Sequence, residues 1–553
     1  MSHNKNRQPA FALTMILLLA GLLRLPWLAD APPGLHPDEA ASTWNAYCLL
    51  RTGMDQVGVS WPMFYSRGLG ANRSTLYYYL TMPFQAVGGL GVWTARLPVA
   101  TAGIGAVLAL YWVASALFGR WIGLMAALLL ALNPWAITLS RIGHDACVAP
   151  LLTAAALGSM LWASLPIAGP GDGLARAIRC GLSGLLCAVA CYGYPSIRIF
   201  IPVMLIVLLV ANRRAWRDLF QDSARRRACA VFVVAFMALF GPLAIKHLID
   251  PAIAKRSASI WITNDAPSLR AAAWAILSRY AAHFSPDFLF LHGDANVGRG
   301  VPGIGPFHWY ALPLLALGFI RCASRCVASP SHRAALMLVL LYPISDLLFS
   351  APGPHAFRSA TGLIGLVLVC AIGAQSAIAW VRTKNAGVAR LAFGLLLLTM
   401  GASTAAHAAY YMTKARHLPE VRREFHADLV EAGAWLKPRW DQYEAIFCTN
   451  KGMNMPYIVM LVATDYDPAR WFREPRSVHN PGEWDLYTRF GKFYTMYHPV
   501  FFAPAIEALQ SNSRPDRVLF ILRPGEVTDT RKIVHEIRDS MGRPTLVLIE
   551  DVL

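Results

Sequence analysis

The sequence predicts an α-helical polytopic membrane protein with about eleven transmembrane helices, followed by a soluble α/β domain. Three observations predict this fold class. Of the 553 residues, 56% are hydrophobic and 15% are charged, whereas soluble domains contain about 45–50% apolar and about 25% charged residues. The apolar residues form blocks of about 18–25 residues, the length that a helix needs to cross about 30 Å of hydrocarbon. The links between these blocks are short and either basic or rich in Pro and Gly.

The first apolar block runs from Phe11 to about Leu28 and follows a basic N-terminus. Residues Ala29-Asp30-Ala31 after it resemble a small-residue cleavage site, so the block is either a first span or a cleaved signal. Both interpretations deliver the following residues to the outer side. The further blocks that predict spans cover residues 94–118, 121–139, 149–166, 178–194, 199–211, 228–248, 307–321, 334–350, 359–381 and 389–410.

Basic residues orient these spans, because cytoplasmic links carry an excess of Lys and Arg. With the N-terminus inside, every strongly basic short link falls on the cytoplasmic side, including 212–227 with its six arginines. We therefore expect a transmembrane domain over 1–410 and an extracytoplasmic soluble domain over 411–553. The outward segments of the transmembrane domain are two large loops, 30–93 and 249–306, and the short links 140–148, 195–198 and 351–358.

The composition also excludes two classes of protein. A formal net charge of +18 is compatible with nucleic-acid binding, but the topology explains the arginines in the short links between apolar blocks. We therefore expect no nucleic-acid partner. Five of the ten cysteines lie in or beside apolar blocks, where thiols pack as small hydrophobic groups. No disulfide framework is predicted.

The predicted soluble domain has charged residues throughout. Its pattern is amphipathic from Glu420 to Leu436, and strand-like runs occur at Ala445–Cys448, Arg517–Leu522 and Thr545–Ile549. This pattern predicts a small α/β domain. Its Arg523-Pro524-Gly525-Glu526 segment predicts an ordinary turn.

The first outward loop contains two adjacent carboxylates, Asp38 and Glu39, within Pro32-Pro33-Gly34-Leu35-His36-Pro37-Asp38-Glu39-Ala40. The residues that follow have a helical pattern, so the pair lies at a helix start near the membrane surface. Acidic residues at a helix start have a structural explanation, since they cap helices and interact favourably with the positive end of the helix dipole. A carboxylate at this place can instead accept a proton from an acceptor hydroxyl. The aromatic stretch 76–93 predicts an interfacial or re-entrant helix.

Cations recur in the outward segments, where the positive-inside rule leaves them rare. These cations also have structural explanations. An Arg and an Asp can form an ion pair within one helix end, and an arginine can extend from a helix end toward water. Together they indicate an anionic ligand, such as a phosphate attached to a lipid tail. The candidate ligand-binding residues are Arg67, Arg73, Arg141, His144, Tyr194, Arg198, His355 and Arg358, and Asp145 adds a further carboxylate.

At these residues the sequence resembles the bacterial GT-C glycosyltransferases, the group that contains the protein O-mannosyltransferases and the lipid A aminoarabinose transferase. The resemblance covers most of the first 410 residues in order. It rests on Arg24-Leu-Pro-Trp-Leu28, Pro33-Gly-Leu-His-Pro-Asp-Glu-Ala40, Asn72-Arg-Ser-Thr-Leu-Tyr-Tyr-Tyr79, Ala95-Arg96-Leu-Pro98, Leu117-Phe-Gly-Arg120, Asn133-Pro-Trp135 through Ser140-Arg141, Phe284-Ser-Pro-Asp-Phe-Leu-Phe290, Gly293-Asp294 and His355 to Arg358.

Members of this group move a sugar from a polyprenyl phosphate to an acceptor on the outer side of the membrane, with inversion. The resemblance implies that Asp38 is the general base, with Glu39 as its neighbour and Asp145 as a second acidic residue. It also implies that arginines and His355 neutralise the donor phosphate. Two carboxylates and a phosphate can hold Mg²⁺ or Mn²⁺, so Asp38, Glu39 and Asp145 are the candidate ligands of a divalent cation. No other cofactor is expected.

The resemblance further implies a bacterial inner-membrane protein whose active site and C-terminal domain face the periplasm. The donor sugar, a hexose or a pentose, and the acceptor, which is a lipid, a glycan or a protein, stay open. An alternative function is a transporter or flippase for a lipid-linked anionic substrate, which requires charges inside the spans. Asp346, in the predicted span 334–350, is the chief residue of that kind. A third hypothesis is that the protein is a non-catalytic subunit that presents its outer domain to a partner.

Overall fold

The computed structural model describes residues 3–68, 71–165, 172–211, 222–251, 262, 266, 268–350, 353–479, 486–496, 517–527 and 532–551. Parts of three predicted links, 212–221, 252–261 and 351–352, therefore lie outside the described residues. The chain divides into two compact units. The first comprises Met1–Pro26, Val99–Arg141 and Asp145–Ala409, and the second comprises Trp27–Pro98, Ile142–His144 and Tyr410–Leu553.

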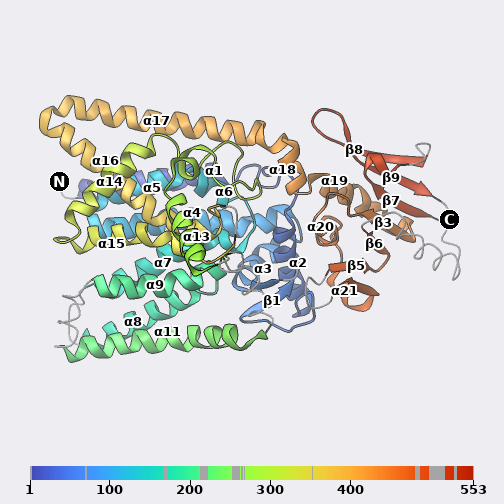
Figure 1. Ribbon diagram of the computed structural model, residues 1–553, viewed down its shortest axis with the longest axis horizontal. Helices are drawn as coiled ribbons and strands as arrows, with labels where there is room; N and C mark the ends of the chain where they lie inside the picture. Colours follow the sequence, from blue (N-terminus) through green and yellow to red (C-terminus); the bar gives the residue numbers. More distant parts are fainter. Residues whose placement is uncertain are drawn as a thin grey trace. The chain divides into compact units, whose positions relative to one another are not determined.

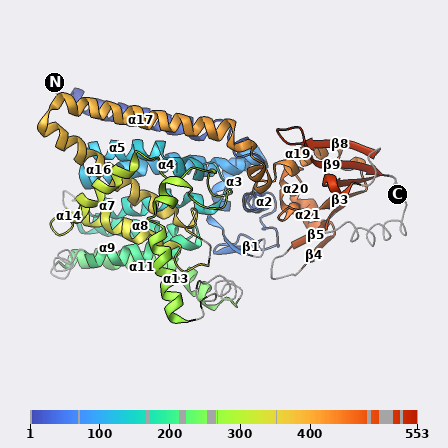
Figure 2. The same ribbon diagram turned by 45° about the horizontal axis from the view of Figure 1, so that its top comes forward.

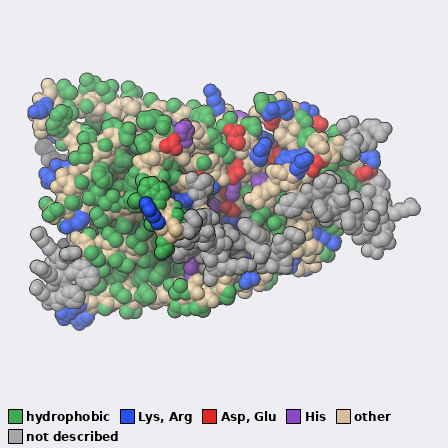
Figure 3. Space-filling model, viewed as in Figure 1, with side chains coloured by type: hydrophobic (Ala, Val, Ile, Leu, Met, Phe, Trp, Pro, Cys, Tyr) green, Lys and Arg blue, Asp and Glu red, His purple; other side chains and the backbone are tan. Residues whose placement is uncertain are grey.

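The first unit is built from apolar helices, and each predicted span overlaps one of them. These helices are α1 (His3–Arg24), α4 (Val92–Phe118), α5 (Arg120–Leu132), α7 (Ala149–Ala163), α8 (Asp172–Ala190), α9 (Pro195–Ala211), α11 (Ser223–Ile249), α14 (Ala311–Arg325), α15 (Pro330–Leu341), α16 (Gly362–Lys384) and α17 (Ala386–Thr413). Within the described residues, six helical segments are long and apolar enough to cross a membrane. Hydrophobic side chains cover most of the visible face of these helices (Figure 3). The full count of about eleven spans stays a prediction.

Two predicted spans are interrupted in the structure. The span 121–139 breaks at Asn133, whose side-chain oxygen accepts a hydrogen bond of 2.8 Å from the backbone N–H of Ala136 and so caps α6 (Pro134–Leu139). The span 334–350 ends as an α-helix at Leu341 and continues as a 3₁₀ turn, η4 (Tyr342–Ser345). Asp346 therefore lies at a helix end and not within a continuous span.

Glycines let some of these helices approach closely. In Figure 1, α8 and α11 lie side by side, and so do α14 and α16. A Cβ atom added at Gly318 of α14 would overlap the backbone of Val369 in α16, and one at Gly373 of α16 would overlap the backbone of Leu314. Small residues at such positions are typical of helix packing in membranes, because they allow backbone contact.

The second unit contains a sheet that follows the apolar helices in sequence (Figure 2). Among the described residues the strand order is β4-β5-β6-β3-β7-β9-β8, and β3 is parallel to both of its neighbours. The strands are β3 (Ala445–Thr449), β4 (Arg476–His479), β5 (Leu486–Phe490), β6 (Phe493–Met496), β7 (Val518–Leu522), β8 (Ile533–Arg538) and β9 (Pro544–Asp551). Strands β3, β7 and β9 occupy the three predicted strand-like runs. The predicted amphipathic helix is two helices, α18 (Pro419–Glu424) and α19 (Ala427–Leu436).

The first outward loop packs with the C-terminal residues inside this unit. It forms α2 (Pro37–Thr52), the hairpin of β1 (Tyr65–Gly68) and β2 (Ala71–Ser74), and α3 (Leu76–Gly88). Trp44 of α2 packs edge-to-face on Trp471 of α21 (Pro468–Arg473), with ring centroids 5.9 Å apart. One buried cluster combines α2 residues with α19, α20 (Pro456–Ala463) and one face of the sheet. The loop and the C-terminal residues therefore share a hydrophobic core.

Candidate active site

Asp38 lies in the first turn of α2, and the local sequence explains why the helix begins there. His36 is the N-cap and Pro37 occupies the first helical position, where its missing N–H costs nothing. The backbone N–H of Asp38 donates a hydrogen bond of 3.1 Å to Nδ1 of His36. In return, the side chain of Glu39 accepts a hydrogen bond of 3.0 Å from the backbone N–H of His36. This reciprocal capping box fixes both carboxylates at the helix start.

The Asp38 carboxylate contacts an arginine and a histidine from other segments of the second unit. Arg73 of β2 donates a hydrogen bond to its Oδ1, and Nε2 of His144 lies 3.5 Å from its Oδ2. Burial alone would raise the pKa of Asp38, but Arg73 and His144 hold that pKa well below its ordinary value. The side chain is 32% exposed, whereas those of Arg73 and His144 are at most 10% exposed. Asp38 is therefore an ionised carboxylate that solvent can reach.

Glu39 has a different environment, although it follows Asp38 directly. Its side chain is fully buried and forms a bidentate pair with Arg96, whose Nε and Nη2 lie 2.9 and 3.0 Å from the two carboxylate oxygens. The backbone N–H of Gly143 donates a further hydrogen bond of 2.5 Å. Burial would raise the pKa of Glu39, but Arg96 lowers it below the ordinary value. All the acceptor positions of Glu39 are filled, so we assign it a structural role in place of the catalytic role expected from the sequence.

Arg96 completes this buried structure. Besides Glu39, it donates hydrogen bonds of 2.7–3.0 Å to the backbone carbonyls of Leu28, Pro32 and Gly34. It therefore ties the turn before α2 to the start of α4. The sequence offered a signal for this residue, since Ala95-Arg96-Leu-Pro98 is one of the segments that carry the GT-C resemblance.

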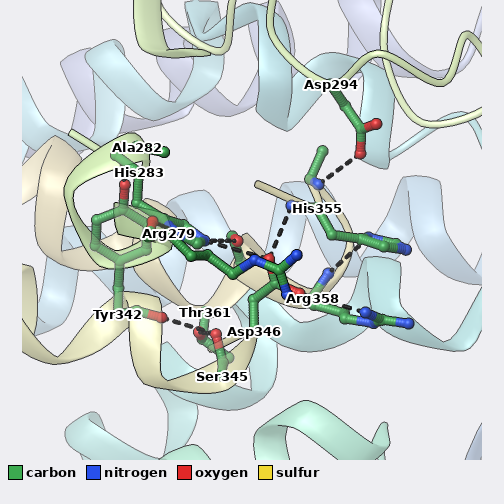
Figure 4. Close-up of polar contacts among 12 residues, drawn as sticks. Arg279, Ala282, His283, Asp294, Tyr342, Ser345, Asp346, His355, Arg358 and Thr361 are labelled. Carbon is green, nitrogen blue, oxygen red and sulfur yellow. Dashed lines mark hydrogen bonds and ion pairs between the residues drawn. The ribbon is translucent and has the colours of Figure 1, made fainter. Parts of the chain in front are cut away.

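A second polar cluster lies in the first unit, around Asp346 (Figure 4). Its carboxylate is fully buried and accepts a hydrogen bond of 3.0 Å from the backbone N–H of His355. Nε2 of His283 lies 3.4 Å from one oxygen, and Nη1 of Arg358 lies 3.5 Å from the other. Arg279 of α13 (Leu269–Ala282) interacts electrostatically with both Asp346 and Arg358. Two arginines thus share one carboxylate, which leaves an excess of positive charge.

The protonation of His283 follows from its partners. Nδ1 lies 2.8 Å from the carbonyl oxygen of Arg279, and because a carbonyl only accepts, Nδ1 must carry a proton. Nε2 faces the hydroxyl of Ser359 at 3.0 Å as well as Asp346. The imidazole therefore links α13 to η5 (Arg358–Thr361) through Asp346.

Asp294 links the second large outward loop to the segment before Arg358. It accepts hydrogen bonds of 2.9 Å from Arg299 and 2.8 Å from the backbone N–H of Ala356. A small open hollow adjoins it in the same unit. The side chains of this hollow include Trp135, Thr138, Asp294, Arg299, Pro306 and His407.

The remaining residues that were predicted to bind a ligand contact mainly the protein backbone. Arg141 is fully buried and donates to the backbone carbonyls of Arg24 and Pro26 at 3.0 and 2.9 Å. Arg198 donates to the carbonyl of Cys191 at 3.1 Å and interacts electrostatically with Asp145. The carbonyl of Tyr194 accepts the first hydrogen bonds of α9. Arg67 is exposed on the hairpin that also carries Arg73.

The similarity of this chain to known proteins is found in solved structures. No family model and no curated protein sequence matches the chain. ArnT from Cupriavidus metallidurans, in a crystal structure bound to undecaprenyl phosphate, is 13% identical, with a TM-score of 0.55 and coverage of 98% of both chains. The Archaeoglobus fulgidus oligosaccharyltransferase in its apo form is 14% identical, with a TM-score of 0.52, and the match covers 84% of this chain and 64% of that one. Both are GT-C enzymes, the group that the sequence resembles.

The chain has the GT-C fold. The structure of the archaeal enzyme AglB with an inhibitory peptide and a dolichol-phosphate matches as well, with a TM-score of 0.51, 12% identity and coverage of 93% of this chain and 69% of that one. At these identities the similarity shows the fold alone.

Two of the carboxylates expected to hold a divalent cation, Asp38 and Glu39, are already paired with arginines. Both oxygens of Glu39 are occupied by Arg96, and Asp38 is paired with Arg73. Across the part of the chain that the structure describes, no group of three or more His, Cys, Asp or Glu side chains is arranged to hold a metal ion. We therefore assign no chemical step to a metal.

Sequence reasoning missed several members of the two polar clusters. His283 and Arg279 are ordinary residues in the sequence, because Asp346 lies far away from them along the chain. Asp346 carried a signal, since it is a carboxylate in an apolar block. In the structure Asp346 is fully buried directly after the 3₁₀ turn that follows α15, with His283 and Arg358 as its partners.

Proposed function

We propose that the protein is a glycosyltransferase that moves a sugar from a polyprenyl-phosphate-linked donor to an acceptor on the outer face of the bacterial inner membrane. The observation that carries this proposal is the ionised, solvent-reachable carboxylate of Asp38 at a helix start in a chain with the GT-C fold. The solved structures with undecaprenyl phosphate and with dolichol-phosphate are matches of the same fold, which supports a lipid-linked donor.

The proposed reaction is a single displacement with inversion. Asp38 accepts the proton of an acceptor hydroxyl while that oxygen attacks the anomeric carbon of the donor sugar. The bond between the anomeric carbon and the phosphate oxygen breaks, and its electron pair leaves with the lipid phosphate. The leaving group is already a phosphate, so no nucleotide is required. The phosphate gains negative charge, which cationic side chains stabilise.

Arg73 connects donor binding to the basicity of Asp38. A carboxylate paired with an arginine is a weak base, because the pair stabilises its ionised form. A donor phosphate that competes for the Arg73 guanidinium weakens that pair and raises the pKa of Asp38. The base is then strongest when the donor is bound. Arg67 lies on the same hairpin and supplies a second exposed guanidinium.

The cluster of the first unit is the other proposed binding site for anionic groups of the substrates. Arg358 is 18% exposed and stacks on the ring of Phe349, with 4.6 Å between the guanidinium carbon and the ring centroid. Its pairing with Asp346 orients the guanidinium, and Arg279 contributes the excess positive charge. His355 precedes it by three residues, and Nδ1 of His355 accepts from the backbone N–H of Arg358 at 3.4 Å. An anion is therefore favoured at this cluster.

The proposal is tested with purified protein and a panel of radiolabelled polyprenyl-phosphate sugars that includes hexoses and pentoses. Sugar release from one donor, with free polyprenyl phosphate as the second product, supports the transferase. The same lipids are followed in proteoliposomes in parallel. If no donor is consumed while lipid movement across the membrane accelerates, the protein is a flippase and the proposal fails.

A further inference from the structure

His36 lies between the start of α2 and the C-terminal residues of the second unit. Its Nδ1 accepts the backbone N–H of Asp38 at 3.1 Å, and its Nε2 lies 3.5 Å from Oε1 of Glu424, the last residue of α18. Both His36 and Glu424 are partly exposed, with 20% and 32% of their side chains accessible. One imidazole thus touches the backbone of Asp38 on one side and a carboxylate of the C-terminal region on the other.

The tautomer of this imidazole is determined by its two partners. A backbone N–H only donates, so Nδ1 must be unprotonated to accept it. The proton of a neutral imidazole is then on Nε2, where it points toward Glu424. In the other tautomer, Nδ1 carries the proton. It can no longer cap Asp38 and instead presents an N–H to Oδ2 of Asp38, 3.8 Å away.

The backbones on either side of this contact are packed against each other. The N–H of Leu35 donates a hydrogen bond of 2.5 Å to the carbonyl of Phe425. Gly34 has a φ of +69°, and a Cβ atom added there would overlap that same carbonyl and the backbone of Ala427. The Phe425 ring packs edge-to-face on His36, with centroids 6.0 Å apart. The turn before Asp38 is therefore shaped by residues that follow Glu424.

The C-terminal side of the contact is fixed as well. His426 adopts a left-handed conformation with φ +47°, which ends α18 and starts α19. Its Nε2 accepts the backbone N–H of Asn454 at 3.0 Å, and burial lowers the pKa of His426 to about 4, so this acceptor stays neutral. The segment that carries Glu424 is thus anchored to the rest of the C-terminal region.

We propose that Glu424 is a positioning residue for Asp38 that acts through His36. It holds the His36 imidazole in the tautomer that caps Asp38 and leaves the Asp38 carboxylate to Arg73 and the substrates. The C-terminal region thereby contributes to the active site without touching the sugar. This inference rests on the proposed role of Asp38 as the general base.

Three variants separate the coupling from simple capping. E424A removes the carboxylate, whereas E424Q keeps an oxygen facing Nε2 of His36, 3.5 Å away in the wild-type contact. H36N keeps an N-cap acceptor for Asp38, because Asn caps helices well, but loses the contact with Glu424. E431A is the matched control, since Glu431 is a half-exposed carboxylate of the same unit that pairs with Arg422. The turnover number and the KM for the donor are measured for each variant and for the double variant H36N/E424A.

We expect E424A to lower the turnover number by about tenfold with little change in KM, since a misplaced base affects the chemical step more than donor binding. E424Q should restore most of the lost turnover, E431A should match wild type, and the double variant should be no slower than H36N alone. Additive losses in the double variant, or an E424A enzyme as fast as wild type, would overturn the inference.

A measurement without turnover distinguishes this inference from the proposed function. Hydrogen exchange of a peptide that covers residues 34–42 should be faster in E424A than in wild type and unchanged in E431A. If the exchange changes but the wild type consumes no donor, the positioning contact exists and the transferase proposal is wrong. If the exchange is the same in E424A and wild type, the positioning role of Glu424 is wrong.

Discussion

Arg73 of the β2 hairpin donates a hydrogen bond to Oδ1 of Asp38, so the proposed general base is paired with a guanidinium from another segment of the same unit. The pair explains how a partly buried carboxylate stays ionised. It also makes the base weak until another anion competes for the arginine.

Removal of the guanidinium should move the acid limb of the pH profile. Arg73 lowers the pKa of Asp38, so that pKa should rise in R73M. The acid limb of kcat/KM, which reports the essential base of the free enzyme, should then shift to higher pH. R67M, a change of the exposed arginine on the same hairpin, should leave the limb in place. An R73M profile that coincides with wild type would show that Asp38 is not the titrating base.

The Glu39–Arg96 pair should carry stability. Both side chains are fully buried, and E39A leaves the Arg96 charge without its carboxylate. Such a change typically costs about 3–5 kcal/mol. Thermal unfolding in detergent measures the loss, and E431A should fall within about 0.5 kcal/mol of wild type, as exposed sites do. Equal unfolding midpoints for E39A and E431A would contradict the structural role of Glu39.

The same pair should make stability depend on acidic pH. The pKa of Glu39 is lower in the folded chain than in the unfolded one, where carboxyls have ordinary values of about 4. The stabilisation is therefore complete above that ordinary pKa and is lost as the pH falls through the lower, folded pKa. Unfolding midpoints recorded between pH 7 and 3 should drop more steeply for wild type than for E39Q, which no longer titrates at this position. Parallel curves would refute this assignment.

Gly34 should not tolerate a side chain. Alanine at φ +69° is strained, and its Cβ would overlap the carbonyl of Phe425. We expect G34A to lose about 1–3 kcal/mol or more of stability and most of its turnover. Gly525 is a matched control in the same unit, because a Cβ there meets nothing within 4 Å. A G34A protein as stable and active as G525A would mean that the turn is not clamped.

Asp346 should matter for donor binding. D346N keeps an oxygen for the backbone N–H of His355 but removes the charge that orients Arg358. The KM for the donor should rise by about tenfold, which corresponds to about 1.4 kcal/mol, while kcat changes little. D441N, a change of a carboxylate that is 86% exposed, is the control. An unchanged KM in D346N would remove this cluster from the donor site.

Much of this molecule can be predicted from sequence because its signals are local. Apolar blocks give the helices, the capping pattern places Asp38 at a helix start, and β-branched runs give β3, β7 and β9. The contacts that define the candidate site are not local. Glu39 and Arg96 are 57 residues apart, and the chain between His36 and Glu424 is far longer.

Two residues that are adjacent in the sequence also have different surroundings, and their spacing does not predict this difference. Asp38 and Glu39 form one acidic motif in sequence, yet one side chain reaches solvent and the other is fully buried. Successive side chains of a helix start point in different directions, and the partner that each one meets is set by tertiary packing. The break of a predicted span at Asn133 is a milder case, since an Asn-Pro pair is a recognisable start of a new helix.

The role of Asp38 as the general base is tested by comparing wild type with D38N. The donor is the one that the panel of polyprenyl-phosphate sugars identifies. Donor binding and release of polyprenyl phosphate are measured on the same samples, with D441N as the control for an exposed carboxylate. We expect D38N to bind the donor as wild type does but to release polyprenyl phosphate about 10²–10⁴-fold more slowly, because it lacks the general base. A D38N protein that binds the donor and turns it over at the rate of D441N would contradict the role of Asp38.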